Sequence, residues 1–213
     1  MMGDLSGKMK IEWNSYSDSN SSHDNQDSVL INKEKKVCAI ADGVTSGVKG
    51  KEASQIAVHS IDLYTGPEKL NQLFEYAHEK VSKLAIYPYY SATTLVIGAI
   101  QKQILYIASV GDSSAFLKRG NKIQLLTESD RLGIASLSSA IGTNIKEIHR
   151  NEIKLQENDA ILFCTDGVTD NLNESELASL MDTHSSRNVV TVALNKKIKR
   201  DDISAIFAYV SYA

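Results

Sequence analysis

The apolar positions of the chain fall into short continuous runs and two longer amphipathic stretches. Residues 36–42 (KVCAIAD) form a short apolar run that ends at Asp-Gly, which predicts a buried strand followed by a turn. Two helices are predicted next, because small or apolar residues recur on one face of each, a pattern typical of helices that lie on a sheet. These residues are Ala53, Ile56, Ala57, Ser60, Ile61 and Tyr64 in the first helix, and Leu70, Leu73, Phe74, Ala77, Val81 and Leu84 in the second.

The rest of the chain is dominated by strand patterns. The predicted strands cover residues 93–100, 104–110, 115–118, 122–126, 148–155, 160–164 and 203–210, and two short helices cover 174–182 and 185–195. Short connections favour antiparallel pairing, and continuous apolar runs such as ILYIASV indicate strands that are covered on both faces. Strict strand–helix alternation is absent, which disfavours a parallel dinucleotide-binding sheet. We therefore expect an α+β fold, a four-layer αββα sandwich of two mostly antiparallel sheets flanked by helices.

Composition supports one packed domain. The chain has 213 residues, of which 42% are hydrophobic and 23% charged, so that disorder is not expected. We predict a single domain over residues 1–213, with flexible residues at 1–9 and a flexible surface loop at 14–28, a segment rich in Ser, Asn and Asp. The net charge of −3 lacks the basic excess that nucleic-acid binding requires.

No segment has the features of export or of membrane insertion. Residues 1–13 lack the apolar core of a secretory signal, and no run approaches the roughly 18 apolar residues needed to span a bilayer. The cytoplasm is therefore the expected location, without membrane contact. Cys38 and Cys164 lie in apolar runs and are expected to be buried, reduced thiols.

Aspartates mark the ends of several predicted strands. They are Asp42, Asp112, Asp166 and Asp201, and Asp27 precedes the apolar run at 29–31. A single Asp-Gly after a strand is most simply an ordinary turn. The same acidic residue at several strand ends indicates more, because carboxylates that cluster without cations repel one another and lose their charge. Divalent cations are the natural counter-charge.

The missing ligand types narrow the choice of metal. The five histidines show no HExxH pairing, and the two cysteines show no CxxC spacing, so a zinc site is not indicated. Ligation by oxygen alone favours Mg²⁺ or Mn²⁺. Two such cations about 3.5–4 Å apart can hold a bridging water, lower its pKa and support an in-line displacement at phosphorus. An Asp followed by Gly suits this site, since the Gly lets its own carbonyl approach a cation.

Eight short motifs, in order between about residues 25 and 204, resemble those of the metal-dependent PPM family, also called the protein phosphatase 2C family. Each motif alone is weak, and the ordered set is specific. The motifs are Asn25-Gln26-Asp27, Ala41-Asp42-Gly43 with residues 50–54, Ala92-Thr93-Thr94, Val110-Gly111-Asp112-Ser113, Leu126-Thr127 with Asp130, Ile141-Gly142, residues 165–170 (TDGVTD) and residues 201–204 (DDIS).

The resemblance implies a role for each acidic residue. Asp42 would bridge two metals, with the Gly43 carbonyl bound to one of them, and Asp42 and Asp166 would be central to catalysis. Asp166 and Asp201 would hold one metal, and Asp27 would act largely through water. Asp112 together with Asp166 would hold a third, weaker metal. The implied cofactors are Mn²⁺ or Mg²⁺, two bound tightly and a third more weakly.

Three departures from the family pattern concern substrate binding. The Arg that often precedes the motif Asn by three residues is Ser22 here, with His23 beside it, and the Arg after VGDS is Ser114. Only residues 131–140 occupy the place of the family's long flap. The sequence therefore does not identify the residue that binds the substrate phosphate, and the candidates are Ser22, His23 and Arg131. This reduced form resembles small bacterial phosphatases of stress and sporulation signalling.

The leading interpretation is a metal-dependent protein phosphatase acting on phosphoserine or phosphothreonine through a metal-activated bridging water. A dedicated regulator of one bacterial signalling partner is an alternative within this class. A non-catalytic sensor or scaffold of the same fold is a second, although the aspartate set is complete. A phosphohydrolase of small molecules is a third. The expected partner is a phosphoprotein.

Overall fold

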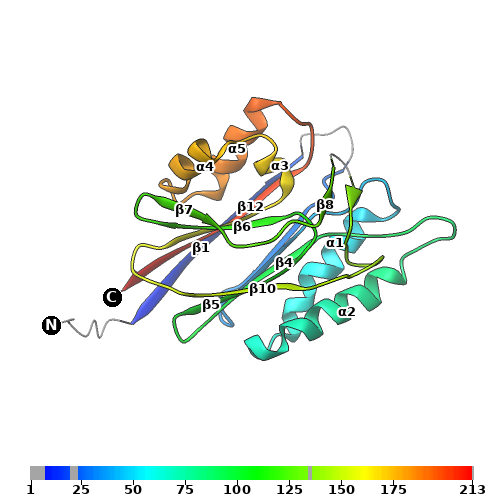
Figure 1. The fold of residues 1–213 in the computed structure, drawn as a ribbon, viewed down its shortest axis with the longest axis horizontal. Helices are drawn as coiled ribbons and strands as arrows, with labels where there is room; N and C mark the ends of the chain where they lie inside the picture. Colours follow the sequence, from blue (N-terminus) through cyan, green and yellow to red (C-terminus); the bar gives the residue numbers. More distant parts are fainter. Residues whose placement is uncertain (1–7, 20–23, 134–135, 213) are drawn as a thin grey trace.

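The computed structural model describes residues 8–19, 24–133 and 136–212, which form two five-stranded antiparallel sheets packed face to face (Figure 1). The first sheet has the order β1-β12-β11-β6-β7, with bounds Met9–Asp18, Ile203–Tyr212, Ala160–Cys164, Ser114–Arg119 and Lys122–Leu125. The second has the order β10-β5-β4-β3-β2, with bounds His149–Lys154, Ile104–Val110, Leu95–Gln101, Val37–Ala41 and Ser28–Asn32.

Helices cover the outer face of each sheet (Figure 1). The second sheet is covered by α1 (Gly50–His59) and α2 (Leu70–Ser82), which are linked by the short 3₁₀ helices η1 (Ser60–Leu63) and η2 (Pro67–Lys69). The first sheet is covered by α3 (Asp166–Thr169), α4 (Glu174–Met181) and α5 (Ser186–Lys196). The predicted four-layer αββα sandwich is thus confirmed.

Alternation along the buried strands explains the layers. In β3, Val37, Ala39 and Ala41 pack toward α1 and α2, whereas Cys38 and Ile40 pack between the two sheets. The same holds for β11 in the first sheet, whose alternate residues pack between the sheets or toward α4 and α5. Such strands are apolar at every position because both faces are covered, as the continuous runs predicted.

The prediction of a loop at 14–28 is wrong for its first part. Residues 9–18 form β1, an edge strand paired along its whole length with β12, from Met9↔Tyr212 to Asp18↔Ile203. Most of its side chains are exposed or half-buried, so its polar composition resembles that of a loop, and pairing with β12 decides its conformation. Residues 1–7, part of the segment predicted to be flexible, lie outside the described residues.

Two further predictions concern burial and the membrane. Cys38 and Cys164 are both buried free thiols, as expected. Among the residues that the structure describes, no helix combines the length and the apolar character needed to cross a bilayer.

Candidate active site

The antiparallel register brings five of the sequence-predicted aspartates to one end of the sandwich. Asp42 follows β3 and Asp27 precedes its partner β2, with Ser28 opposite Ala41. Asp112 comes two residues after β5. Asp166 follows β11 by two residues, and Asp201 precedes the adjacent strand β12, with Cys164 opposite Ala205. Strand ends that are neighbours in antiparallel sheets lie together, so residues distant in sequence meet there.

A cleft of about 330 Å³ opens at this end of the sandwich. Four of the five aspartates line it, together with two cations and several short polar side chains. The lining residues are Asp42, Val44, Thr45, Ser46, Thr94, Asp112, Arg131, Ser136, Leu137, Asp166, Lys199 and Asp201. Asp27, the fifth aspartate, is buried, with 1% of its surface exposed.

The backbone at Asp42 and Gly43 is held rigidly. The Asp42 N–H donates to Thr94 Oγ1 at 2.9 Å, and the Asp42 carbonyl accepts from Thr94 N at 2.9 Å and from Thr93 Oγ1 at 2.8 Å. Any side chain at Gly43 would place its Cβ 2.3 Å from the Gly50 carbonyl oxygen. The chain therefore requires glycine here because another segment of backbone approaches closely.

Asp27 is a buried carboxyl with one unsatisfied oxygen. Its Oδ2 accepts from Thr165 Oγ1 at 2.9 Å, whereas Oδ1 is buried and has no hydrogen-bond partner among the described residues. Burial raises the pKa of Asp27 to about 7, against the lowering effect of hydrogen bonds from Ser204 and Thr165. A nearby cation would therefore stabilise the ionised form of Asp27.

The Asp42 carboxylate is also in an unfavourable electrostatic environment for its ionised form. Burial, followed by repulsion from the other carboxylates, raises the pKa of Asp42 well above its usual value. Within residues 8–19, 24–133 and 136–212 no ion pair or hydrogen bond reaches its side chain. We call Asp27 and Asp42 the unclamped carboxylates, since no protein cation pairs with either side chain in the described part of the chain.

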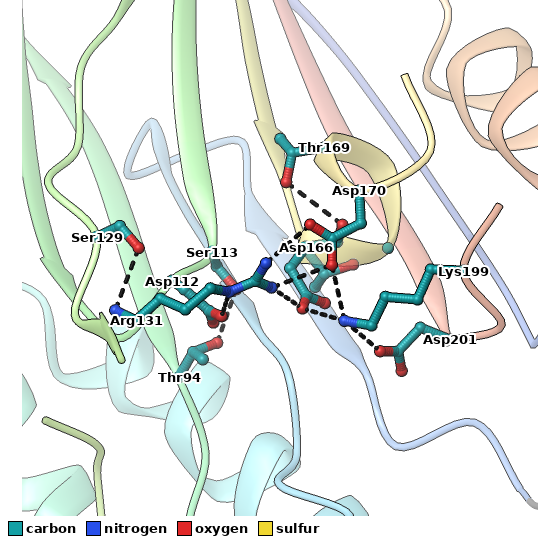
Figure 2. Close-up of polar contacts among 12 residues, drawn as sticks. Thr94, Asp112, Ser113, Ser129, Arg131, Asp166, Thr169, Asp170, Lys199 and Asp201 are labelled. Atoms are coloured by element: carbon teal, nitrogen blue, oxygen red, sulfur yellow. Dashed lines mark hydrogen bonds and ion pairs between the residues drawn. The ribbon is translucent and has the colours of Figure 1, made fainter. Parts of the chain in front are cut away.

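The other carboxylates are held by two cations, as Figure 2 shows. Arg131 donates from Nε to Asp112 Oδ2 at 2.9 Å and from Nη1 to Asp170 Oδ1 at 2.8 Å, and its Nη2 contacts Asp166. Lys199 Nζ lies 2.7 Å from Asp166 Oδ2, 2.8 Å from Asp170 Oδ2 and 3.0 Å from Asp201 Oδ2. We call these four residues the clamped carboxylates: Asp112, Asp166, Asp170 and Asp201.

The ion pairs with Arg131 and Lys199, which we call the clamp, only partly offset the effect of burial on the pKa values of these carboxylates. Burial, and after it the charge of Asp166, raises the pKa values of Asp112 and Asp201 despite their ion pairs. For Asp170, burial also acts to raise the pKa, but hydrogen bonds from Arg131 and Lys199 outweigh it and the pKa is lowered. Six carboxylates face two cations, so the site carries a formal charge of −4 when all six are ionised.

This donor set fits hard divalent cations. All candidate ligands are oxygen atoms, as Mg²⁺ and Mn²⁺ prefer, and the buried Oδ1 atoms of Asp27 and Asp166 both lack a hydrogen-bond partner in the described part of the chain. No three His, Cys, Asp or Glu side chains of the described residues form a ready-made metal cage. Figure 2 shows a guanidinium and an ammonium among these carboxylates, bound to their oxygen atoms.

Sequence reasoning missed two residues of this site. Asp170 lies in the quoted segment 165–170 but was given no role, and Lys199 lies in the basic run KKIKR, which by itself indicates a solvated surface. Arg131, a candidate for phosphate binding, contacts three carboxylates in this structure, and its role toward phosphate stays a prediction. Ser22 and His23, the other two candidates, lie outside the described residues.

Comparisons with known proteins agree on one family. Residues 16–200 match the family model of protein phosphatase 2C. The chain is 27% identical to serine/threonine phosphatase stp of Listeria welshimeri, over 75% of this chain and 78% of that protein. It is similar in fold to the serine/threonine phosphatase PstP/Ppp of Mycobacterium tuberculosis, with a TM-score of 0.82 at 18% identity, covering 94% of this chain and 99% of that one. A PstP catalytic domain in complex with two manganese ions gives a TM-score of 0.82 at 20% identity, covering 96% and 100%.

Proposed function

The chain belongs to the protein phosphatase 2C family, and from that membership we propose that it is a metal-dependent phosphatase of phosphoserine and phosphothreonine in proteins. The observation that carries the proposal is the placement of Asp42. This carboxylate lines the cleft, has a strongly raised pKa and makes no ion pair with a protein cation in the described part of the chain. A site built this way gains most from bound divalent cations.

We propose that two divalent ions are held by five residues. Asp42 and the Gly43 carbonyl would contact them directly, Asp166 and Asp201 would complete one of the sites, and Asp27 would act through water. Manganese is the first choice, supported by the two manganese ions of the PstP relative, and magnesium is the alternative. When bound, such a pair supplies an activated water and neutralises charge on the phosphoryl group during in-line displacement.

The residues of the chain itself contribute rigidity and charge. Thr93 and Thr94 fix the backbone on both sides of the Asp42 peptide, so that its carboxylate is positioned before any substrate arrives. Thr165 orients the Asp27 carboxyl through Oδ2 and itself accepts from Ser204 N at 3.0 Å. Asp27 Oδ1, which has no hydrogen-bond partner among the described residues, is then available to a ligand.

Substrate recognition is proposed to depend on a protein surface rather than on a phosphate clamp. Arg131 directs most of its N–H groups at carboxylates, so it lacks the free pair that a bidentate grip on phosphate needs. The flap is reduced to residues 131–140. The binding energy is therefore proposed to come from a folded phosphoprotein docked around the cleft, with a bacterial stress or sporulation regulator as the partner and the cytoplasm as the site of action.

Two other readings remain distinguishable. A phosphohydrolase of small molecules would hydrolyse small phosphomonoesters at least as efficiently as a phosphoprotein. A non-catalytic sensor or scaffold would hydrolyse neither, although the aspartate set that catalysis needs is present. Comparing a phosphothreonine protein with p-nitrophenyl phosphate separates all three.

The direct test is chelation and restoration. The protein is assayed on a phosphothreonine protein after treatment with EDTA, and again after Mn²⁺ or Mg²⁺ is added back in excess. We expect activity to disappear with EDTA and to return with the metal. Full activity in excess chelator would show that the reaction does not use the proposed metal site.

A further inference from the structure

The guanidinium of Arg131 is almost fully occupied by carboxylates. Nε binds Asp112, Nη1 binds Asp170, and Nη2 contacts Asp166 and also lies 3.2 Å from Asp170 Oδ2. These contacts engage four of the five N–H groups that an arginine possesses. Arg131 therefore joins the turn after β5 to helix α3 as a fixed bridge between three acidic side chains.

The fold itself places this guanidinium. Asp130, the residue before Arg131, accepts from Gly111 N at 2.8 Å through Oδ2, and its Oδ1 lies 3.2 Å from His149 Nε2. The Asp130 N–H in turn donates to the Gly111 carbonyl at 2.9 Å. The backbone that carries Arg131 is thus tied to the turn that carries Asp112, so their ion pair does not depend on a freely moving segment.

Charged groups already bind both oxygens of Asp170 and one oxygen of Asp112. Both oxygens of Asp170 accept from Arg131, and Oδ2 also accepts from Lys199 at 2.8 Å. One oxygen of Asp112 accepts from Arg131 Nε. A divalent ion bound through Asp170 or through Asp112 Oδ2 would have to displace a charged group already bound there, and at Asp112 Oδ1 it would lie beside the Arg131 guanidinium.

We infer that Arg131 is a built-in cation that occupies the place of a third divalent ion beside Asp112, Asp166 and Asp170, so that this site holds two divalent ions. The inference rests on the proposed metal-dependent function. The two ions are expected around the unclamped carboxylates Asp27 and Asp42, whose side chains pair with no protein cation in the described part of the chain. Asp166 can still contribute Oδ1, which has no hydrogen-bond partner among the described residues, to one of these sites. The weaker third metal expected at Asp112 and Asp166 is therefore replaced by a side chain.

The test counts bound ions rather than activity. Chelator-treated protein is titrated with Mn²⁺ by calorimetry, and bound Mn²⁺ is counted in parallel by electron paramagnetic resonance. The parent should bind two ions. Arg131→Ala and the milder Arg131→Gln should each gain a third, weaker site, because Asp112 loses its cation while Asp166 and Asp170 keep only Lys199. Arg131→Lys, which keeps the charge, should still bind two.

Two further variants make the test specific. Arg150→Ala removes an exposed arginine that binds Asn71 rather than a carboxylate, so it should bind two ions as the parent does. The double variant Arg131→Ala with Asp112→Asn should return to two, because the third site needs the uncovered Asp112. Circular dichroism checks that each variant is folded. If Arg131→Ala does not fold, the milder Arg131→Gln still tests the inference.

Several results would overturn the inference. A parent protein with three Mn²⁺ sites would show that Arg131 does not exclude the third ion. Two sites in a folded Arg131→Gln protein would show that the guanidinium is not what limits the number. A protein that binds no Mn²⁺ at all would overturn the proposed function itself, and the inference with it. Activity with two bound ions and no gain in the variants would overturn only the inference.

Discussion

The two ends of the acidic site achieve charge balance in different ways. The clamped carboxylates share Arg131 and Lys199, whereas in the described part of the chain no protein cation pairs with the side chains of the unclamped carboxylates Asp27 and Asp42. The sequence motifs around Asp42 and Asp166 are nearly alike, each an Asp-Gly after a buried strand. The difference arises from what the fold packs next to them, and it indicates where the chain depends on a metal.

The pKa values follow this division only in part, because those of the clamped residues Asp112 and Asp201 are raised despite their ion pairs. Ion pairs overcome burial at Asp170, whose pKa is lowered, while burial dominates at Asp27, whose pKa rises to about 7. A carboxyl group with a raised pKa binds a divalent cation only after it loses a proton that it holds tightly. The comparison therefore predicts that the unclamped carboxylates control metal binding and the clamped ones modulate it.

The largest effect is expected at Asp42. Asp42→Asn removes the unclamped charge without changing side-chain size, and phosphatase activity should fall by at least about a thousandfold, because stabilisation of charge is the main source of the rate. Calorimetry should show the loss of at least one Mn²⁺ site. Asp62→Asn, at an exposed aspartate paired with His59, is the matched control and should change neither. An Asp42→Asn protein that binds two ions as the parent does would remove Asp42 from the site.

A second prediction concerns the pH dependence of stability after treatment with EDTA. The folded-state pKa of Asp27 is about 7 against an ordinary value of 3.8, so folding keeps this group protonated above the pH at which the unfolded chain ionises. Its stabilising contribution is present below pH 4 and is lost as pH rises to about 7. The loss has an upper bound of about 4 kcal/mol, from roughly three pKa units.

The measurement is thermal unfolding from pH 4 to 8 for the parent and Asp27→Asn. The melting temperature of the parent should fall more steeply with rising pH than that of the variant, and excess Mn²⁺ should reverse the difference by stabilising the ionised carboxylate. Parallel curves for the two proteins in EDTA would show that Asp27 does not titrate in this range.

Much of this arrangement could be predicted from the sequence. The alternation within β3 and β11 and the acidic residues at their ends identify buried strands whose ends meet. The strand β1 was missed because its Ser, Asn and Asp residues suggest a loop, and only pairing with β12 shows otherwise. Local composition carries no record of such a partner.

The clamp could not be predicted for a similar reason. Lys199 belongs to a run of basic residues, and Arg131 follows a motif aspartate, so each has a simpler local interpretation. Their contacts with Asp170 span 29 and 39 positions of sequence. Only the packing of α3, β8 (Arg131–Leu132) and the segment before β12 brings these groups together.

A third, smaller effect concerns substrate binding. Because Arg131 is committed to the clamped carboxylates, kcat/KM should be low for p-nitrophenyl phosphate and much higher for the phosphoprotein partner. Ser22→Arg adds a guanidinium where the family often has one, and it should lower KM for p-nitrophenyl phosphate by about tenfold, as one charge-assisted contact allows. Steady-state kinetics with both substrates decide the matter. A parent that already saturates at micromolar p-nitrophenyl phosphate, unchanged by the substitution, would show that another residue grips the phosphate.

The smallest effect is expected at Asp112, and it tests the comparison most directly. Asp112→Asn removes one carboxylate from the clamp, yet Arg131 keeps Asp166 and Asp170 as partners, and the unclamped carboxylates are unchanged. Turnover should therefore fall by only about tenfold, equivalent to about 1.4 kcal/mol, while both Mn²⁺ affinities stay close to those of the parent. The amide keeps the size of the side chain, so a change in packing does not account for the loss. Kinetics and calorimetry on Asp112→Asn and Asp42→Asn side by side give the result. If Asp112→Asn lost a tightly bound ion as Asp42→Asn should, the two ends of the site would not differ in the way their ion pairs indicate.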